Sequence, residues 1–199
     1  MSVNMVGSRL ECVILAAGYS RRLGRDKALL PVGSVTLIQW LYNRVSFHGL
    51  PITLVASNRN ANKIGKSIPR SEIIINPMPE KGRTGSLKLG ISRIDKLRDP
   101  GYRLLVVPVD RPGFSDSSLR RLIASFETTC PEYEGRGGHP LILIESDVEI
   151  VRNSPSEMPL NKIVEPSRIK VSDKHLHLNL DTPNDIDNLE EKLSYILDN

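Results

Sequence analysis

The sequence has few of the residues on which a disulfide-stabilised, zinc-binding or nucleic-acid-binding protein depends. Its 199 residues include two cysteines, one tryptophan and 5% aromatic side chains. Cys12 and Cys130 make neither a disulfide framework nor a metal-ligand cluster, so we expect both to be structural. The net charge is +4, and the few aromatic residues are not interleaved with the basic ones. We therefore expect no nucleic-acid partner.

Long apolar runs are also missing. No stretch approaches the roughly 18 apolar residues that a membrane helix requires, so we expect no membrane span. Residues 1–10 have no apolar stretch after a charged start, which argues against a signal peptide and favours the cytoplasm. A chain of 199 residues is long enough to bury one sizeable core, and we predict a single domain over residues 1–199.

Short apolar runs alternate with amphipathic stretches, which predicts a mostly parallel sheet with helices on both faces. The expected strands are 10–17, 51–57, 72–77 and 102–110, and the expected helices are 35–48, 60–68, 84–97 and 115–129. After residue 135 we expect added strands at 139–145, 148–151 and 168–180, and a last helix at 183–197. Ligands of such sheets bind outside the carboxyl ends of the strands, so residues that follow strands are the candidates for function.

The segment LAAGYSRRLGRDK, residues 15–27, follows the first expected strand and contains two glycines and four basic side chains. Gly18 and Gly24 allow tight turns, at which backbone amides can hold phosphate oxygens. The basic side chains add charge-assisted donors. The segment matches neither G-x-x-x-x-G-K-[ST] nor G-x-G-x-x-G. The residues alone therefore leave two interpretations open, an anion-binding loop and a solvated basic turn.

Five motifs, in order, resemble the MobA-like nucleotidyltransferases, a branch of the NTP transferases that acts on the molybdenum cofactor. Residues 15–27 are similar to the family's L-A-[AG]-G-x-S-x-R-M-G-x-x-K signature, with Leu23 in place of Met. The other four are NPMPEKGRTGSLKLGI at 76–91, VPVDRPGF at 107–114, GRGGHPLIL at 135–143 and LNLDTPNDI at 178–186. The resemblance implies a three-layer, Rossmann-like NTP transferase fold. It also implies Mg²⁺-dependent transfer of an NMP from an NTP to a phosphorylated acceptor.

The resemblance assigns the first loop to the triphosphate. It places Arg22 against the β and γ phosphates and Lys27 against the α-phosphate, where charge builds in the transition state. Arg21 and Arg25 occupy variable positions and can be solvated. The residues expected to bind nucleotide are Leu15, Ala16, Ala17, Gly18, Arg22, Lys27, Gly82, Arg83 and Ser86, and those expected to be catalytic are Lys27, Arg22 and Asp110.

Asp110 and Asp181 are the candidate Mg²⁺ ligands. A carboxylate directly after a buried strand must be exposed, capping or bound to a cation. Alone, the sequence DRPG favours a turn-forming role for Asp110, whereas the resemblance favours a metal ligand. Asp181 can take part in capping the last helix, itself or through Thr182, and still bind a metal. Asn179 is a weaker third candidate.

The sequence says less about which base the nucleotide carries and which acceptor receives the NMP. The spacing of Arg83 and Ser86 is similar to that in cytidylyltransferases of the isoprenoid pathway, but Thr84 as helix cap with Arg83 in solvent is an equal alternative. The form LAAG is typical of cytidylyl enzymes, and a methyl group at Ala17 narrows the space for a purine. We therefore expect CTP rather than GTP.

His139 lacks the partners of a zinc site or a nucleophile relay, so it is either structural or an acceptor contact. Residues 154–168 replace the G-D-x-G-A-R that the family often carries there. The acceptor is therefore open between molybdopterin and another phosphorylated small molecule. A nucleotide-binding module that regulates or scaffolds is the alternative from another class, and the presence of Lys27, Asp110 and Asp181 favours the enzyme.

Overall fold

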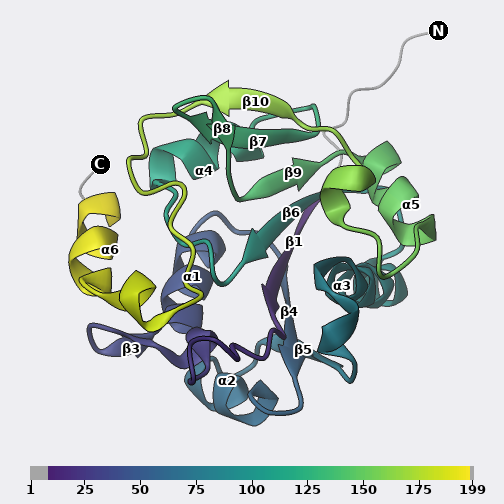
Figure 1. The fold of residues 1–199 in the computed structure, drawn as a ribbon. Helices are drawn as coiled ribbons and strands as arrows, with labels where there is room; N and C mark the ends of the chain where they lie inside the picture. The colour runs from purple at the N-terminus through teal and green to yellow at the C-terminus, as the bar shows by residue number, and fades with distance from the viewer. Residues whose placement is uncertain (1–8, 198–199) are drawn as a thin grey trace, which may run out of the picture.

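The computed structural model describes residues 9–197, which form a central sheet between helices (Figure 1). The strands are β1 (Arg9–Ala16), β2 (Pro31–Val32), β3 (Val35–Thr36), β4 (Ile52–Ser57), β5 (Glu72–Asn76), β6 (Tyr102–Pro108), β7 (Thr129–Tyr133), β8 (Arg136–Gly137), β9 (Leu141–Leu143) and β10 (Ser167–Lys170). The α-helices are α1 (Leu37–Ser46), α2 (Ala61–Ser67), α3 (Arg83–Arg98), α4 (Asp116–Ile123), α5 (Glu145–Asn153) and α6 (Leu189–Leu197). The 3-10 helices are η1 (Lys27–Leu29), η2 (Pro79–Lys81), η3 (Leu160–Lys162) and η4 (Pro183–Ile186).

The main sheet has the strand order β10-β7-β9-β6-β1-β4-β5, and β8 pairs with β7. Strand β1 runs parallel to β4 and β6, and β4 runs parallel to β5. Strand β9 is antiparallel to both of its neighbours. This arrangement confirms the mostly parallel sheet. In residues 9–197 no helix is at once long and apolar enough to cross a membrane, and the expected absence of a signal peptide concerns residues that lie mostly outside this range.

Helices cover both faces because the side chains of β1 alternate between two buried clusters. Cys12 and Ile14 pack with apolar residues of α1, α2, α4 and α6. Val13 and Leu15 pack with those of α3 and α5. Figure 1 shows α3 and α5 together on one side of the sheet, and α1, α4 and α6 on the other. Burial of both faces explains why the strand reads as a continuous apolar run.

In the second half, one expected strand is wrong and one expected helix is shorter than predicted. Residues 148–151 lie inside α5, because Val148 and Val151 are three residues apart and both face the core as they do on a helix. The helix expected over 115–129 ends at Ile123, and β7 begins at Thr129. The apolar run at 148–151 is too short for its periodicity to distinguish a strand from a helix.

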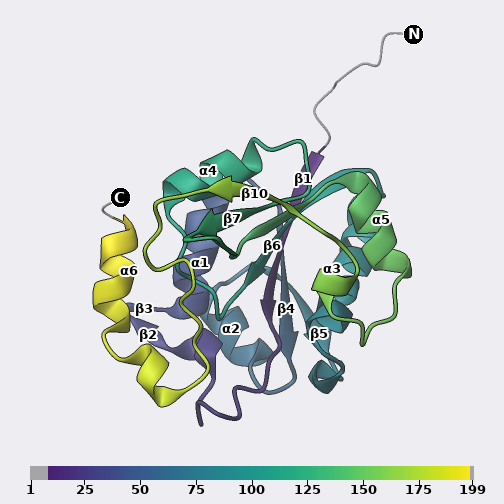
Figure 2. The same cartoon turned by 45° about the horizontal axis from the view of Figure 1, so that its top comes forward.

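The chain after β10 also differs from the expectation. The strand predicted over 168–180 is confined to Ser167–Lys170, and the rest is an irregular connection that leads to α6 (Figure 2). The helix predicted over 183–197 is divided into η4 and α6 at Asn188, whose φ of 56° lies in the left-handed region and interrupts a right-handed helix. These irregular segments carry Asp181.

Candidate functional site

The loop after β1 holds the side chain of Lys27 in a fixed place. The Ser20 hydroxyl accepts the backbone N–H of Lys27 at 3.2 Å. The carboxylate of Asp26 accepts the N–H of Ala28 at 2.9 Å and caps η1, which begins at Lys27. Leu23, the departure from the family motif, is buried in the core and anchors the loop. The local sequence therefore fixes the direction in which Lys27 leaves the backbone.

The connection between β10 and α6 brings Asp181 to the same place. The carbonyl oxygen of Asp110 accepts the N–H of Leu180 at 3.1 Å, so the two segments run side by side. A Cβ atom at Gly113 would lie 1.7 Å from the carbonyl oxygen of His175. Only glycine permits this approach of the two backbones. Asp181 thus reaches the end of β6 although more than 70 residues separate it from Asp110.

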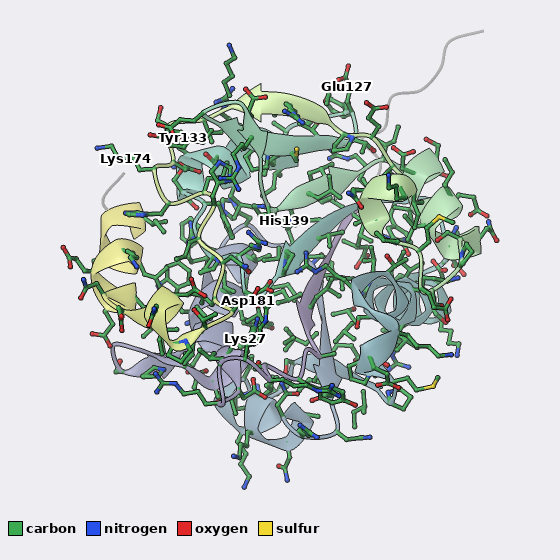
Figure 3. All side chains as sticks on the ribbon, viewed as in Figure 1. Lys27, Glu127, Tyr133, His139, Lys174 and Asp181 are labelled. Atoms are coloured by element: carbon green, nitrogen blue, oxygen red, sulfur yellow. The ribbon has the colours of Figure 1, made fainter. Side chains whose placement is uncertain are left out.

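Lys27 lies between the two carboxylates. Its Nζ is 2.9 Å from Asp181 Oδ1 and 3.4 Å from Asp110 Oδ2, and its side chain is 10% exposed. Arg22 Nη2 lies 2.8 Å from Asp181 Oδ2, and Arg83 Nη2 lies 3.4 Å from Asp110 Oδ2. Figure 3 labels Lys27 and Asp181, which lie together at this point. The structure thus brings together the expected catalytic and metal-binding side chains, which come from three separate segments of the chain, and adds Arg83 from a fourth.

Asp181 is held as a carboxylate. Partial burial opposes its ionisation, but hydrogen bonds from Lys27 and from Asn179, the latter at 2.7 Å, outweigh burial and lower the pKa of Asp181 to about 2. The turn of η4 is capped without this side chain. Asp185 Oδ2 accepts the N–H of Thr182 at 2.6 Å and that of Asp181 at 3.0 Å. Capping therefore leaves the Asp181 carboxylate available to cations.

Asp110 and Asp181 fit a divalent cation. Both touch the same ammonium nitrogen, so both can reach one cation. The Oδ1 atom of Asn179 is buried and has no hydrogen-bond partner in residues 9–197, which leaves a third oxygen at this place. The described residues contain no cluster of three His, Cys, Asp or Glu suited to a metal ion. Asp110, Asp181 and Asn179 offer oxygen donors, which Mg²⁺ prefers, and substrate phosphates would complete its shell.

A cavity of about 340 Å³ opens beside these carboxylates, lined by residues 19–22 with Lys27, Glu80 and Asp181. The backbone of residues 15–18 is expected to hold phosphates. Gly18, just after β1, is exposed, whereas Leu15, Ala16 and Ala17 are buried. The side chain of Ala17 is 3% exposed and belongs to the buried cluster beneath α3. Its methyl group packs in the core, and this removes the main support for the steric argument against a purine.

Two residues of this cavity were missed by sequence reasoning. The hydroxyl of Tyr19 donates to Glu80 Oε2 at 3.3 Å and joins the first loop to η2. The guanidinium groups of Arg21 and Arg59 lie over the Tyr19 ring, at 5.3 Å and 4.5 Å from its centroid. Arg21 therefore stacks on a neighbour. The position of Tyr19 beside Gly18 was the only signal in the sequence.

The residues expected to bind the base, Gly82, Arg83 and Ser86, differ in their surroundings. Gly82 precedes α3 with a φ of 98°, which suits glycine. Thr84 is buried within the helix, whose N-cap position is Gly82, so the expected Thr84 cap is wrong. The Arg83 side chain is 41% exposed, as the same alternative expected, but it also reaches Asp110 at 3.4 Å. Ser86 is buried, and its hydroxyl accepts the side chain N–H of Asn76 at 2.9 Å. The fold uses Ser86 to hold the end of β5 against α3.

A second cavity, of about 470 Å³, is lined by Arg83 and lies between parts of 81–84, 130–141 and 156–166. His139 and Cys130 line it. Burial, together with the positive charges of Arg83 and Arg111, lowers the pKa of His139 to about 4, so its imidazole is neutral at neutral pH. Cys12 and Cys130 are both free, buried thiols, as expected of structural cysteines, although Cys130 also faces this cavity.

When the sequence is compared with known sequences, the family model and the relatives that match it point to the same family. A family model described as MobA-like NTP transferase domain matches residues 12–171. A molybdenum cofactor guanylyltransferase of Rhizobium leguminosarum bv. trifolii is 26% identical over 213 aligned positions, which cover 94% of each chain. One of Xanthomonas euvesicatoria pv. vesicatoria is 30% identical over 122 residues, 61% of this chain and 58% of the relative. The chain thus spans less than two thirds of the length of this second relative.

Solved structures have the same fold. Rv0371c of Mycobacterium tuberculosis H37Rv superposes with a TM-score of 0.77 at 21% identity, covering 94% of this chain and 100% of the other. A manganese complex of the same protein gives a TM-score of 0.71 at 19% identity, with coverage of 92% and 98%. Molybdopterin-guanine dinucleotide biosynthesis protein A of Archaeoglobus fulgidus gives 0.66 at 16%, with coverage of 93% and 99%. The three-layer NTP transferase fold expected from the motifs is confirmed.

Proposed function

Because the chain belongs to the MobA-like NTP transferase family, we propose that it moves an NMP from an NTP to a phosphorylated acceptor and releases pyrophosphate. The observation that carries the proposal is the contact of one ammonium group, Lys27, with two carboxylates, Asp110 and Asp181. This cluster lies at the carboxyl ends of β1 and β6, where open parallel sheets bind ligands.

The chemistry needs no covalent intermediate on the protein. An oxygen of the acceptor phosphate attacks the α-phosphorus in line, the bond from this phosphorus to its bridging oxygen breaks, and pyrophosphate leaves. Lys27 stabilises charge at the α-phosphate, and Arg22 neutralises the departing phosphates. Asp110 and Asp181 would hold a divalent cation, Mg²⁺ or Mn²⁺. When bound, this cation offsets negative charge on the phosphates and orients them.

We propose GTP as the nucleotide, with CTP as the alternative. The curated relatives carry the name guanylyltransferase, which favours GTP. The sequence LAAG favoured CTP through the methyl group of Ala17, but that methyl group packs in the core. Arg83, the residue expected beside the base, contacts Asp110 and does not by itself favour either nucleotide.

Molybdopterin is the acceptor that the names of the relatives favour. The second cavity is where we place it, with His139 as an expected contact. The segment 154–168, which replaces the family's usual motif, forms part of the wall of this cavity, so its residues decide which acceptor fits.

A single assay tests the proposal. The purified protein is incubated with GTP or CTP, with Mg²⁺ or Mn²⁺ and with molybdopterin, and the release of pyrophosphate is followed. We expect release that requires acceptor, metal and nucleotide together, fastest with GTP. Nucleotide binding without release under every combination would instead support a regulatory or scaffolding module. A higher rate with CTP would keep the transferase and change the base.

A further inference from the structure

Arg111 lies next to Asp110 and is the least satisfied cation of the site. Its Nε atom is buried and has no hydrogen-bond partner among residues 9–197, and no described carboxylate forms an ion pair with it. Burial lowers the pKa of this half-buried guanidinium; the carboxylates of Asp110 and Asp181 raise it, and the charges of Arg83 and Arg136 lower it. Such a group is costly to keep without a partner, which suggests that the partner is a ligand.

The charges of the site do not balance. Asp110 and Asp181 are already in contact with Lys27, Arg22 and Arg83. Arg111 is a fourth cation beside these two carboxylates, and even with Glu80 of the adjoining cavity counted the positive charges are in excess. A divalent cation on the carboxylates would add to this excess. Lys27 and Arg22 line the cavity of about 340 Å³ that we assign to the triphosphate, and Arg111 does not. We therefore assign Arg111 to a second anion.

His139, in the lining of the second cavity, is also unsatisfied. Its Nδ1 atom is buried and has no hydrogen-bond partner in the described part of the chain. His139 lines the second cavity together with Arg83, and Arg83 contacts Asp110, the residue next to Arg111. A neutral imidazole can donate one hydrogen bond to a phosphate oxygen.

The cavity that His139 lines has apolar walls and a basic edge. Cys130, Leu141, Met158, Leu160 and Val164 supply apolar surface. Of its charged residues, Lys81 pairs with Glu157 at 3.9 Å, which leaves Arg83 as the cation of this edge that can meet an anionic ligand. Its volume of about 470 Å³ lies within the range of small-molecule sites. This combination suits a molecule with an apolar, ring-sized body and an anionic end.

We propose that Arg111 and His139 bind the phosphate of the acceptor, and that the ring-sized body of the acceptor lies against the apolar wall of this cavity. The assignment rests on the proposed nucleotidyl transfer. Arg83 lines the cavity and touches Asp110, which touches Lys27 on the nucleotide side. A phosphate held by Arg111 would therefore lie beside the metal ligands, where the attacking oxygen has to be.

Binding of phenyl phosphate, a small aromatic phosphomonoester, tests this site. The nucleotide site is first filled with Mg²⁺ and a non-hydrolysable α,β-methylene analogue of the nucleotide. Calorimetric titration then compares phenyl phosphate with inorganic phosphate and with phenol. We expect phenyl phosphate to bind most tightly, because it alone has both the anionic end and the ring.

The test variant is Arg111→Gln, and the matched control is Arg120→Gln. Arg120 is exposed on α4 and pairs with Asp116 at 2.9 Å, so its loss removes the same charge away from the site. We expect Arg111→Gln to weaken phenyl phosphate about 10-fold, the cost of one charge-assisted hydrogen bond, and the control to leave it unchanged. Equal affinity in Arg111→Gln and the parent would overturn the assignment.

Further measurements separate this proposal from the proposed function. Affinity for the nucleotide analogue should be nearly unchanged in Arg111→Gln, and with molybdopterin the KM for the acceptor should rise while the KM for the nucleotide stays. If the parent binds nucleotide but not phenyl phosphate, the acceptor site is wrong and the transferase stands. If the parent binds no nucleotide, the proposed function itself is wrong. Should Arg111→Gln melt early, His139→Gln repeats the test, and unchanged affinity there would refute the site.

Discussion

The ammonium nitrogen of Lys27 lies 2.9 Å from Oδ1 of Asp181, although 154 residues separate the two. Lys27 is positioned by the loop after the first strand, and Asp181 by the connection before the last helix. Their contact also includes Asp110 at 3.4 Å, at the end of β6. The site therefore exists only when the first strand, the middle of the sheet and the end of the chain are packed together.

Replacing Lys27 with alanine should slow the chemical step more than it weakens nucleotide binding, because its charge matters most in the transition state. We expect kcat to fall by on the order of 10²- to 10³-fold, the usual cost of one preorganised donor. Lys66→Ala, on the exposed surface of α2, is the matched control. Single-turnover kinetics separate the two effects, and unchanged turnover would remove Lys27 from the reaction.

Asp110→Asn keeps the shape of the side chain and removes its charge. We expect the variant to lose metal-dependent transfer and to bind Mn²⁺ at least about tenfold more weakly, since a carboxylate is replaced by a neutral oxygen. Because Lys27 remains paired with Asp181, we expect the free energy of unfolding to fall by only about 1 kcal/mol, which lowers the melting temperature by about 2–4 °C. Asp116→Asn on α4 is the control. Full activity of Asp110→Asn would return Asp110 to a turn-forming role.

Ala17→Gly tests which base the pocket prefers and why. Because the Ala17 methyl group is buried in the core, its removal should destabilise the fold by about 1 kcal/mol and leave the preference between GTP and CTP unchanged. Calorimetric titration of both proteins with both nucleotides in Mg²⁺ measures the preference. If the parent prefers CTP and the variant narrows the gap, the steric argument from LAAG is correct after all.

Gly113→Ala should damage both the fold and the site. The added methyl group would collide with the carbonyl oxygen of His175, a backbone atom that cannot move alone. We expect a loss of about 1–3 kcal/mol in the free energy of unfolding, as for other overpacked positions. Displacement of the connection before Asp181 should also lower metal affinity. Gly33→Ala provides a comparison, because its φ of 57° strains an alanine while a Cβ there meets nothing within 4 Å. A Gly113→Ala variant as stable as the parent would show that the approach of the two backbones is not required.

The sequence by itself determined the features that depend on neighbouring residues. Alternating apolar and amphipathic segments specified the mostly parallel sheet, because burial on both faces imposes a continuous apolar run on each strand. The 15–27 motif pointed to a loop after β1, where the structure places it. Asp110 was expected at the end of its strand for the same local reason.

Only the tertiary structure decided which of these residues meet. The contact of Arg83 with Asp110, the burial of Ala17 and the unsatisfied Arg111 depend on segments far apart in the chain, whose packing no local pattern encodes. The same holds for residues 148–151, where α5 formed because Val148 and Val151 could be buried against the sheet as a helix. Short apolar runs fit either element, so tertiary packing makes the choice.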